Sequence, residues 1–296
     1  MLIDQIVYGF IIGLVYSLIA LGFTLIYNTT GVIHFAQGEL SMLSGFIALM
    51  VSGYFAKIFF LPIIPIFLVC FVSVSLIGIF LERCIYRPMV NLNASLICRI
   101  ICTLAVALTF QNLAIIVWGA RANLLPGGNL LLGGPIVLRG YTVKPITYYT
   151  LVITVSLMIT LHLFLKKTKL GLAMRAVAYN HELAALMGVR THLLMMLSFG
   201  IGAGLAAIAG LLLGIMLFVQ FQVGFIAFKG FYGAVLGGLG SFPGAIVGGI
   251  LIGIIENIGA GYVSSGYKDA IAFLVLLVFL LFRPNGLFRG RVQEKV

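Results

Sequence analysis

The stretch Lys166–His192 reads KKTKLGLAMRAVAYNHELAALMGVRTH, and long apolar segments lie on both sides of it. It carries five positive charges against one acid, Glu182. From Gly171 onward, apolar residues recur at helical spacing with polar residues between them. Gly188 then stands where a glycine commonly ends a helix. We therefore predict a polar, helix-forming segment outside the membrane, while the rest of the chain lies within it.

The composition indicates an integral membrane protein. Of the 296 residues, 62% are hydrophobic and only 8% are charged, and the mean hydropathy is +1.21. Soluble domains carry about 25% charged residues. Long apolar runs alternate with short polar joins, whereas a β-barrel would show segments of roughly ten residues with alternating polarity. We predict an all-α integral membrane protein in which residues 1–296 form a single transmembrane domain.

The net charge of +11 is better explained by the orientation of the chain in the membrane than by nucleic-acid binding. Twelve of the 18 Lys and Arg residues fall in three places: residues 82–99, residues 166–192 and the C-terminal tail. Because positively charged joins are enriched on the cytoplasmic side, we predict that all three lie there. Counting crossings from them places the N-terminus outside and the C-terminus in the cytoplasm.

Two apolar segments are interrupted by glycine and polar residues. The first, TTGVIHFAQGEL at residues 29–40, is either a loop before the second span or a break within it, and we favour the break. The second, residues 229–256, is either one kinked span or a re-entrant hairpin. We predict about eight transmembrane helices, with the exact number depending on residues 221–268. The residues assigned to the breaks are Gly38, Gly240, Pro243 and Gly244.

Sequence motifs for catalysis are missing. There is no GxxxxGK[ST] phosphate loop, so we predict that the chain does not hydrolyse ATP itself. The sequence also lacks a Ser/His/Asp or Cys/His arrangement and the HExxH spacing of a metal site. We predict a protein that is not an enzyme and binds no metal or cofactor of its own, with its four cysteines reduced.

Polar side chains in or beside the predicted spans are candidates for a translocation pathway. An ionisable group at the bilayer centre costs about 2.5–3.5 kcal/mol on insertion scales, so such groups usually have a function. Glu39 and Glu256 are the clearest cases, one in or after each interrupted segment. The alternative is that both acids lie near the interfaces and pair with Arg or Lys. The full candidate set is His34, Gln37, Glu39, Gln111, Asn112, Glu256 and Asn257.

The residues alone leave two interpretations of the segment 166–192 open. The small side chains of Ala184 and Ala185 give a helix a flat face on which another protein could dock. A basic amphipathic helix could equally rest on the membrane surface.

The pattern Glu182-x-Ala184-Ala185-x-x-Gly188 resembles the cytoplasmic loop of ABC importer permeases, in which a short helix docks on the ATPase subunit. The flanking GLAMRAVAYNHELAALMGV is similar to one group, the permease subunits of branched-chain amino-acid importers. Further blocks resemble this group's broken-helix motif, first cytoplasmic join, Gly-rich segment and tail: TTGVIHFAQGEL, LERCIYRPM, AVLGGLGSFPGAIVGGILIGIIE and RPNGLF. The resemblance implies a coupling loop at residues 166–192 with Arg175, Glu182, Ala184, Ala185 and Gly188 as its coupling residues.

The first block departs from the family pattern at two positions. His34 stands where the family usually has Asn, and Gln37 where His is common. The resemblance implies transport of branched-chain aliphatic amino acids, and this departure keeps urea or a short amide open as the alternative substrate. An autonomous channel or secondary transporter is the competing class.

The resemblance also implies partners and a location. An importer of this kind has a second, related permease subunit, two cytoplasmic ATPase subunits and a periplasmic binding protein. It lies in the bacterial inner membrane among its lipids, and ATP acts on the partner subunits rather than on this chain. No nucleic-acid partner is expected.

Overall fold

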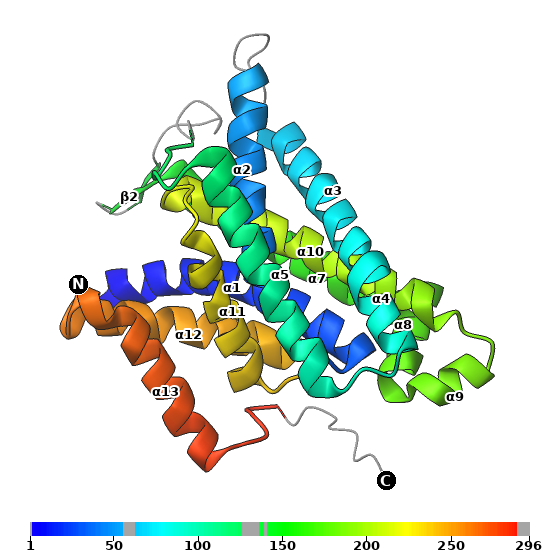
Figure 1. The fold of residues 1–296 in the computed structure, drawn as a ribbon. Coiled ribbons are helices and arrows are strands. Elements are labelled where there is room, and N and C mark those ends of the chain that lie inside the picture. The colour runs from blue at the N-terminus through cyan, green and yellow to red at the C-terminus, as the bar shows by residue number, and fades with distance from the viewer. Residues whose placement is uncertain (1, 56–62, 126–135, 139–140, 289–296) are drawn as a thin grey trace.

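The computed structural model describes residues 2–55, 63–125, 136–138 and 141–288, and the described chain is almost entirely helical (Figure 1). The helices are α1 (Leu2–Thr30), α2 (Gln37–Phe55), α3 (Ile63–Leu81), α4 (Arg87–Asn91), α5 (Leu96–Trp118), α7 (Pro145–Lys167), α8 (Lys169–Tyr179), α9 (His181–Leu186), α10 (Thr191–Met216), α11 (Val223–Gly237), α12 (Phe242–Tyr262) and α13 (Lys268–Phe282). A π-helical turn at Glu82–Tyr86 joins α3 to α4, and a 3-10 turn at Ser265–Tyr267 precedes α13. Strands β1 (Ile136–Leu138) and β2 (Tyr141–Val143) pair in an antiparallel hairpin.

Seven described helices are long and apolar enough to cross a membrane: α1, α3 continued through α4, α5, α7, α10, α12, and α13 with its preceding turn. The apolar helix α11 is shorter, with 15 residues. About 20 residues suffice to cross the hydrocarbon core, and α2 comes close to this with 19. The prediction of an all-α, multi-pass membrane protein with about eight membrane helices is confirmed.

Helix α1 lies at the centre of the bundle and packs along α12, which runs beside it in the opposite direction (Figure 1). A Cβ at Gly13 would lie only 2.7 Å from the Cα of Ile250, so the two backbones meet closely. One turn further along α1, the hydroxyl of Ser17 donates a 2.8 Å hydrogen bond to the carbonyl of Ile246. Without water to drive association, close packing and polar contacts of this kind hold membrane helices together.

The small residues of α10 are packing positions, as their spacing predicts. A Cβ at Gly202 would meet the Ile26 side chain of α1 at 3.0 Å. Gly210 lies directly on the backbone of Ser41 in α2, where no side chain fits. Each of these glycines therefore brings α10 against a different neighbour.

The first interrupted segment differs from its prediction. Helix α2 begins at Gln37 and continues without a break, so a second span broken at Gly38 is wrong. The irregular backbone comes earlier, where Gly31 has a φ of +68°. Gly38 instead lets α2 approach α11, because a Cβ there would lie 2.5 Å from the Gly224 carbonyl oxygen. Although irregular, the joining segment includes the buried residue Val32.

The second interruption contains Gly240, as assigned, but ends before Pro243 and Gly244. Helix α11 ends at Gly237, and the turn that follows uses positive φ angles at Gly238 (101°) and Gly240 (94°). Pro243 and Gly244 already belong to α12. Proline is tolerated in the first turn of a helix, because the N–H that it lacks would have no acceptor within the helix. The assignment of these last two residues to the break is therefore wrong.

Helices α11 and α12 form a hairpin rather than one kinked span (Figure 1). Gly233 faces Gly249 and Gly237 faces Gly244, so the two helices run antiparallel with glycine against glycine. The second helix is also longer than the dozen residues expected, because α12 continues for 21 residues.

Candidate translocation and coupling sites

His34 lies in the buried joint between α1 and α2, with 1% of its surface exposed. Its Nδ1 is 2.8 Å from the hydroxyl of Tyr86, and its ring packs against Phe199 of α10. Tyr86 ends the π-helical turn, whose wider winding changes the direction of the side chains that follow it. His34 therefore connects the segment between α1 and α2 with the basic segment at residues 82–99. Its Nε2 has no hydrogen-bond partner in the described structure.

Gln37 and Glu39 continue this polar site into the first turn of α2. The Gln37 amide nitrogen donates a 2.7 Å hydrogen bond to the Gly202 carbonyl. Glu39 is 7% exposed, and its carboxylate lies against Gly224 at the start of α11. Among the described residues, neither Gln37 Oε1 nor Glu39 Oε2 has a hydrogen-bond partner. Buried polar atoms are normally paired, so unpaired ones indicate an unbound polar ligand or water.

Gln111 and Asn112 lie elsewhere. Both are on α5, where Asn112 is exposed on the outside of the bundle and bonds the carbonyl of Leu108 in its own helix at 2.7 Å. Gln111 is half-buried. No described contact joins either residue to His34 or Glu39.

Glu256 lies in a network of charged and polar side chains from four helices. Its Oε1 is 2.5 Å from Lys229 Nζ of α11, and its Oε2 accepts a 3.0 Å hydrogen bond from Tyr16 of α1. Lys229 Nζ also lies 2.6 Å from Asp269 Oδ1 at the start of α13. The Lys229 and Glu256 side chains are 4% and 5% exposed, whereas Asp269 is 73% exposed. We call Tyr16, Lys229, Glu256 and Asp269 the charge network.

The charge network decides between the two interpretations of Glu256. Tyr16 bonds one of its carboxylate oxygens and Lys229 bonds the other. Glu256 is therefore paired with a lysine, as the alternative interpretation expects. Glu39 differs, because one of its oxygens is unpaired in the described part of the chain. The amide of Asn257 donates a 3.0 Å hydrogen bond to the Gly253 carbonyl one turn back in the same helix, so it does not join the network.

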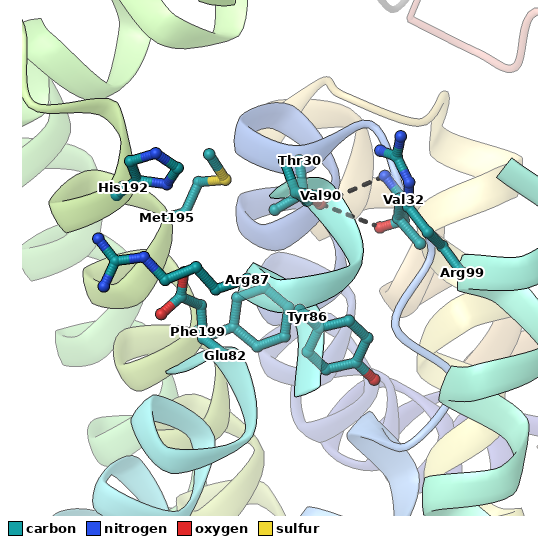
Figure 2. A pocket seen from close by; sticks show the side chains of 10 residues that line it. All are labelled: Thr30, Val32, Glu82, Tyr86, Arg87, Val90, Arg99, His192, Met195 and Phe199. Carbon is teal, nitrogen blue, oxygen red and sulfur yellow. Dashed lines mark hydrogen bonds between the residues drawn. The ribbon is translucent and has the colours of Figure 1, made fainter. Parts of the chain in front are cut away.

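A narrow pocket opens beside the polar joint (Figure 2). Its walls are Thr30, Val32, Glu82, Tyr86, Arg87, Val90, Arg99, His192, Met195 and Phe199. Figure 2 shows Arg87 beside His192 on one side of the Tyr86 ring and Arg99 on the other. The cavity volume of about 20 Å³ is enough for a water molecule, so an amino acid does not fit in this conformation.

The segment 166–192 folds as two short helices rather than one. Thr168 accepts a hydrogen bond from Gly171 N at 2.9 Å and begins α8, and Asn180 accepts one from Leu183 N at 3.0 Å and begins α9. Threonine and asparagine side chains at the start of a helix accept hydrogen bonds from backbone N–H groups that have no partner within the first turn. The split therefore follows from a second N-cap within the sequence.

Gly188 ends α9 as predicted, with a φ of +81°. Its N–H bonds the Ala185 carbonyl and the next N–H, of Val189, bonds the Ala184 carbonyl, both at 3.0 Å. These two bonds are the paired contacts of the Schellman motif. Ala184 is buried against the protein, so this alanine does not contribute to an outward docking face.

The outward face of this segment is apolar instead. Leu186 and Met187 are 82% and 85% exposed, and Leu172 and Leu183 are exposed as well. Arg175 is also exposed and reaches back to the Lys166 carbonyl at 3.4 Å. Large apolar side chains gathered on a surface outside the spans usually mark an interaction site.

His181 is the first residue of α9. Burial lowers its pKa below the ordinary value, and the charge of His192 lowers the pKa further, while Glu182 raises it. The neutral form of His181 is therefore favoured. In the described residues, His181 Nε2 and His192 Nδ1 are buried without hydrogen-bond partners.

Sequence reasoning missed Tyr16, Tyr86, Lys229 and Asp269. Lys229 and Asp269 carried a usable signal, because a lysine within a predicted membrane helix requires a nearby acid. The two tyrosines carried none, because tyrosine is ordinarily enriched at membrane interfaces and does not by itself indicate a buried polar contact. No group of His, Cys, Asp or Glu in the described chain is arranged to hold a metal ion.

A multi-pass helical bundle with a basic segment outside its spans and buried polar side chains between its helices fits a membrane permease. The family model described as "Branched-chain amino acid transport system / permease component" matches residues 5–280. The chain belongs to this family.

Named relatives are similar along nearly the whole chain. The high-affinity branched-chain amino acid transport system permease protein BraD of Pseudomonas aeruginosa is 34% identical over 304 residues, covering 99% of this chain and 98% of the relative. LivH of Escherichia coli strain K12, of the same description, is 32% identical, covering 99% and 97%. A probable LivH of Methanocaldococcus jannaschii is 31% identical, covering 91% and 87%. No solved structure matches the chain significantly.

Proposed function

We propose that this chain is one of two membrane subunits of an ATP-driven importer of branched-chain aliphatic amino acids. The observation that carries the proposal is the similarity over 99% of the chain to permeases of high-affinity branched-chain amino acid transport systems. The partners are a second, related permease, two cytoplasmic ATPase subunits and a periplasmic binding protein.

The coupling segment of this proposal is α8 and α9. The exposed side chains of Leu183, Leu186 and Met187 form the surface that the ATPase subunit covers. Gly171 supports this role, because it lies so close to the end of α7 that the coupling segment and that span form one rigid bend. A push on α9 would therefore reach α7 and, through Thr191, the start of α10.

The pathway of this proposal runs past the polar joint. His34, Gln37 and Glu39 are buried, and each has one polar atom without a partner in the described structure. A zwitterion crossing the membrane needs such donors and acceptors in place of its water. The narrow cavity beside Tyr86 fits a state in which the inner end of this path is closed.

The proposed orientation places α8, α9 and the C-terminus in the cytoplasm and the N-terminus outside. The positive charges support it, since twelve of 18 lie in the two basic joins and the tail. Single cysteines at Met187 and Val263 test it, because both positions are exposed and lie on opposite sides in this orientation. A membrane-impermeant maleimide added outside should label only position 263.

Reconstitution tests the function itself. The chain is placed in proteoliposomes with its second permease, the ATPase subunits and the binding protein, and uptake of radiolabelled leucine is measured with and without ATP. We expect ATP-dependent uptake that Met187→Asp abolishes without loss of membrane insertion. Val263→Asp, an equally exposed apolar position at the end of α12, is the matched control and should transport normally.

Two alternatives have distinct outcomes in the same assay. Leucine flux without the ATPase subunits would identify an autonomous channel or secondary transporter. ATP-dependent uptake of urea or a short amide but not leucine would support the alternative substrate, which the departures at His34 and Gln37 suggest.

A further inference from the structure

The short helix α11 is held at its middle and at its C-terminal end by the last part of the chain. At the C-terminal end, Leu287 N donates a 2.9 Å hydrogen bond to the Leu236 carbonyl, and Phe288 N donates one of 3.0 Å to the Gly237 carbonyl. Near the middle of the helix, Lys229 contacts Asp269 at 2.6 Å. Asp269 lies in the first turn of α13, whereas Leu287 and Phe288 follow the end of that helix.

The hydrogen bonds from the tail meet a physical need of α11. The last four carbonyls of a helix have no partner within it. Leu236 and Gly237 are buried, so their carbonyls need hydrogen-bond partners from the protein itself. Residues 286–288 supply two of the missing donors. They reach that position because Gly286, with a φ of +76°, lies in direct contact with the backbone of Gly238.

A separate apolar core accompanies these contacts. Leu236 of α11, Ile252 of α12, and Ala272 and Leu276 of α13 are buried together, and Leu287 packs against them. The large core of the bundle is built mainly by other helices, above all α1, α2 and α10. The tail therefore closes a small packing unit made of α11, α12 and α13, to which α1 contributes Tyr16.

We propose that Asp269 and residues Gly286–Phe288 act as positioning groups that clamp α11 to α13, so that α11, α12 and α13 move as one unit during transport. For the transport cycle, the proposal rests on the ATP-driven import proposed above. The turn between α11 and α12 is also bonded to α1, because the Asn28 amide donates a 3.0 Å hydrogen bond to the Gly240 carbonyl.

A proline at position 287 tests the clamp, because proline has no N–H to donate. In the complete transporter in nanodiscs, hydrogen exchange is measured at the last turn of α11. We expect Leu287→Pro to speed exchange there roughly fivefold, the size of one lost backbone hydrogen bond. Leu287→Ala removes the same apolar contact but keeps the donor, so it should leave that turn protected. Equal protection in the two variants would overturn the clamp.

Distances between spin labels test the moving unit without disturbing the clamp. Labels replace exposed residues Phe225 on α11, Leu281 on α13 and Ile116 on α5. Between the nucleotide-free and ATP-trapped states, we expect the 225–281 distance to stay constant while the 225–116 distance changes. A change at 225–281 as large as that at 225–116 would refute the single unit.

The two tests separate the clamp from the proposed function. Hydrogen exchange needs no transport, so it decides the clamp whatever the substrate is. Failure of ATP-dependent uptake in the wild-type reconstitution contradicts the import proposal alone, and the exchange result on Leu287→Pro still stands.

Discussion

Replacing Lys229 with methionine removes the positive charge from the charge network while keeping a side chain of similar length. Glu256 then remains buried, with only the Tyr16 hydroxyl bonded to it and Lys268 Nζ 3.7 Å away. Losing one partner of a buried ion pair costs about 3–5 kcal/mol. Because Lys268 still supplies a partly exposed counter-charge, we expect the lower end, about 3 kcal/mol.

Replacing the other partner, Glu256, should destabilise the protein less. Glu256→Gln leaves Lys229 in contact with Asp269 at 2.6 Å, so the buried lysine keeps a direct counter-charge. We expect a loss of about 1 kcal/mol. The double variant Lys229→Met/Glu256→Gln leaves no buried charge, so its loss should be about 1–2 kcal/mol, smaller than that of Lys229→Met alone.

Unfolding in mild detergent with increasing SDS measures the four free energies of this double-mutant cycle. The prediction is a coupling of about 2 kcal/mol between positions 229 and 256, with the double variant more stable than Lys229→Met. If the two losses simply add, the lysine and the glutamate do not stabilise one another, and the physical account of the charge network fails.

Four further predictions concern the coupling segment and the polar joint. Gly188→Ala forces a side chain into a φ of +81°, at a cost of about 1 kcal/mol, and should speed trypsin cleavage at Arg190; Gly188→Asn tolerates this φ and is the control. His181 has a lowered folded pKa, so its contribution to stability is complete above the ordinary value of 6.5 and is lost as the pH falls. Cleavage of the same segment should therefore increase below about pH 6, and His181→Gln should flatten this profile. Tyr86→Phe leaves His34 Nδ1 unpaired in a buried site and should lower thermal stability by about 1–3 kcal/mol, whereas His34→Asn should keep uptake of aliphatic amino acids.

Each of these predictions has a contrary result. Equal cleavage of Gly188→Ala and Gly188→Asn would mean that the end of α9 is not strained by a side chain. A pH profile that His181→Gln leaves unchanged assigns the effect to another group. Wild-type stability of Tyr86→Phe would show that water replaces the hydroxyl, and complete loss of uptake in His34→Asn would give that histidine a role of its own.

The sequence was sufficient for features that depend on local chemistry. Apolar run length predicted the membrane helices, and a glycine after an apolar helical pattern predicted the end of α9 at Gly188. Local patterns failed where a contact spans the chain. Tyr16 and Glu256 are 240 positions apart, so no pattern near either residue predicts their hydrogen bond.

The errors at glycines have a common physical origin. Gly38 was assigned to a helix break, but it sits in a continuous helix because α11 passes too close for a side chain. A glycine that permits a turn and a glycine that permits contact are identical in sequence. Ala184 illustrates the same limit, since small size suits both a docking face and the buried position that it occupies.

The packing of α1 against α12 has a consequence for biosynthesis. During synthesis, α1 is made before α12 and meets this partner only after about 240 further residues have been made. At about 5–20 residues per second, this delay is roughly 10–50 s. During that time α1 must remain in the bilayer without α12 to cover its glycines. Its uninterrupted apolar run, with Asp4 as its one charged residue, therefore serves insertion first and packing later.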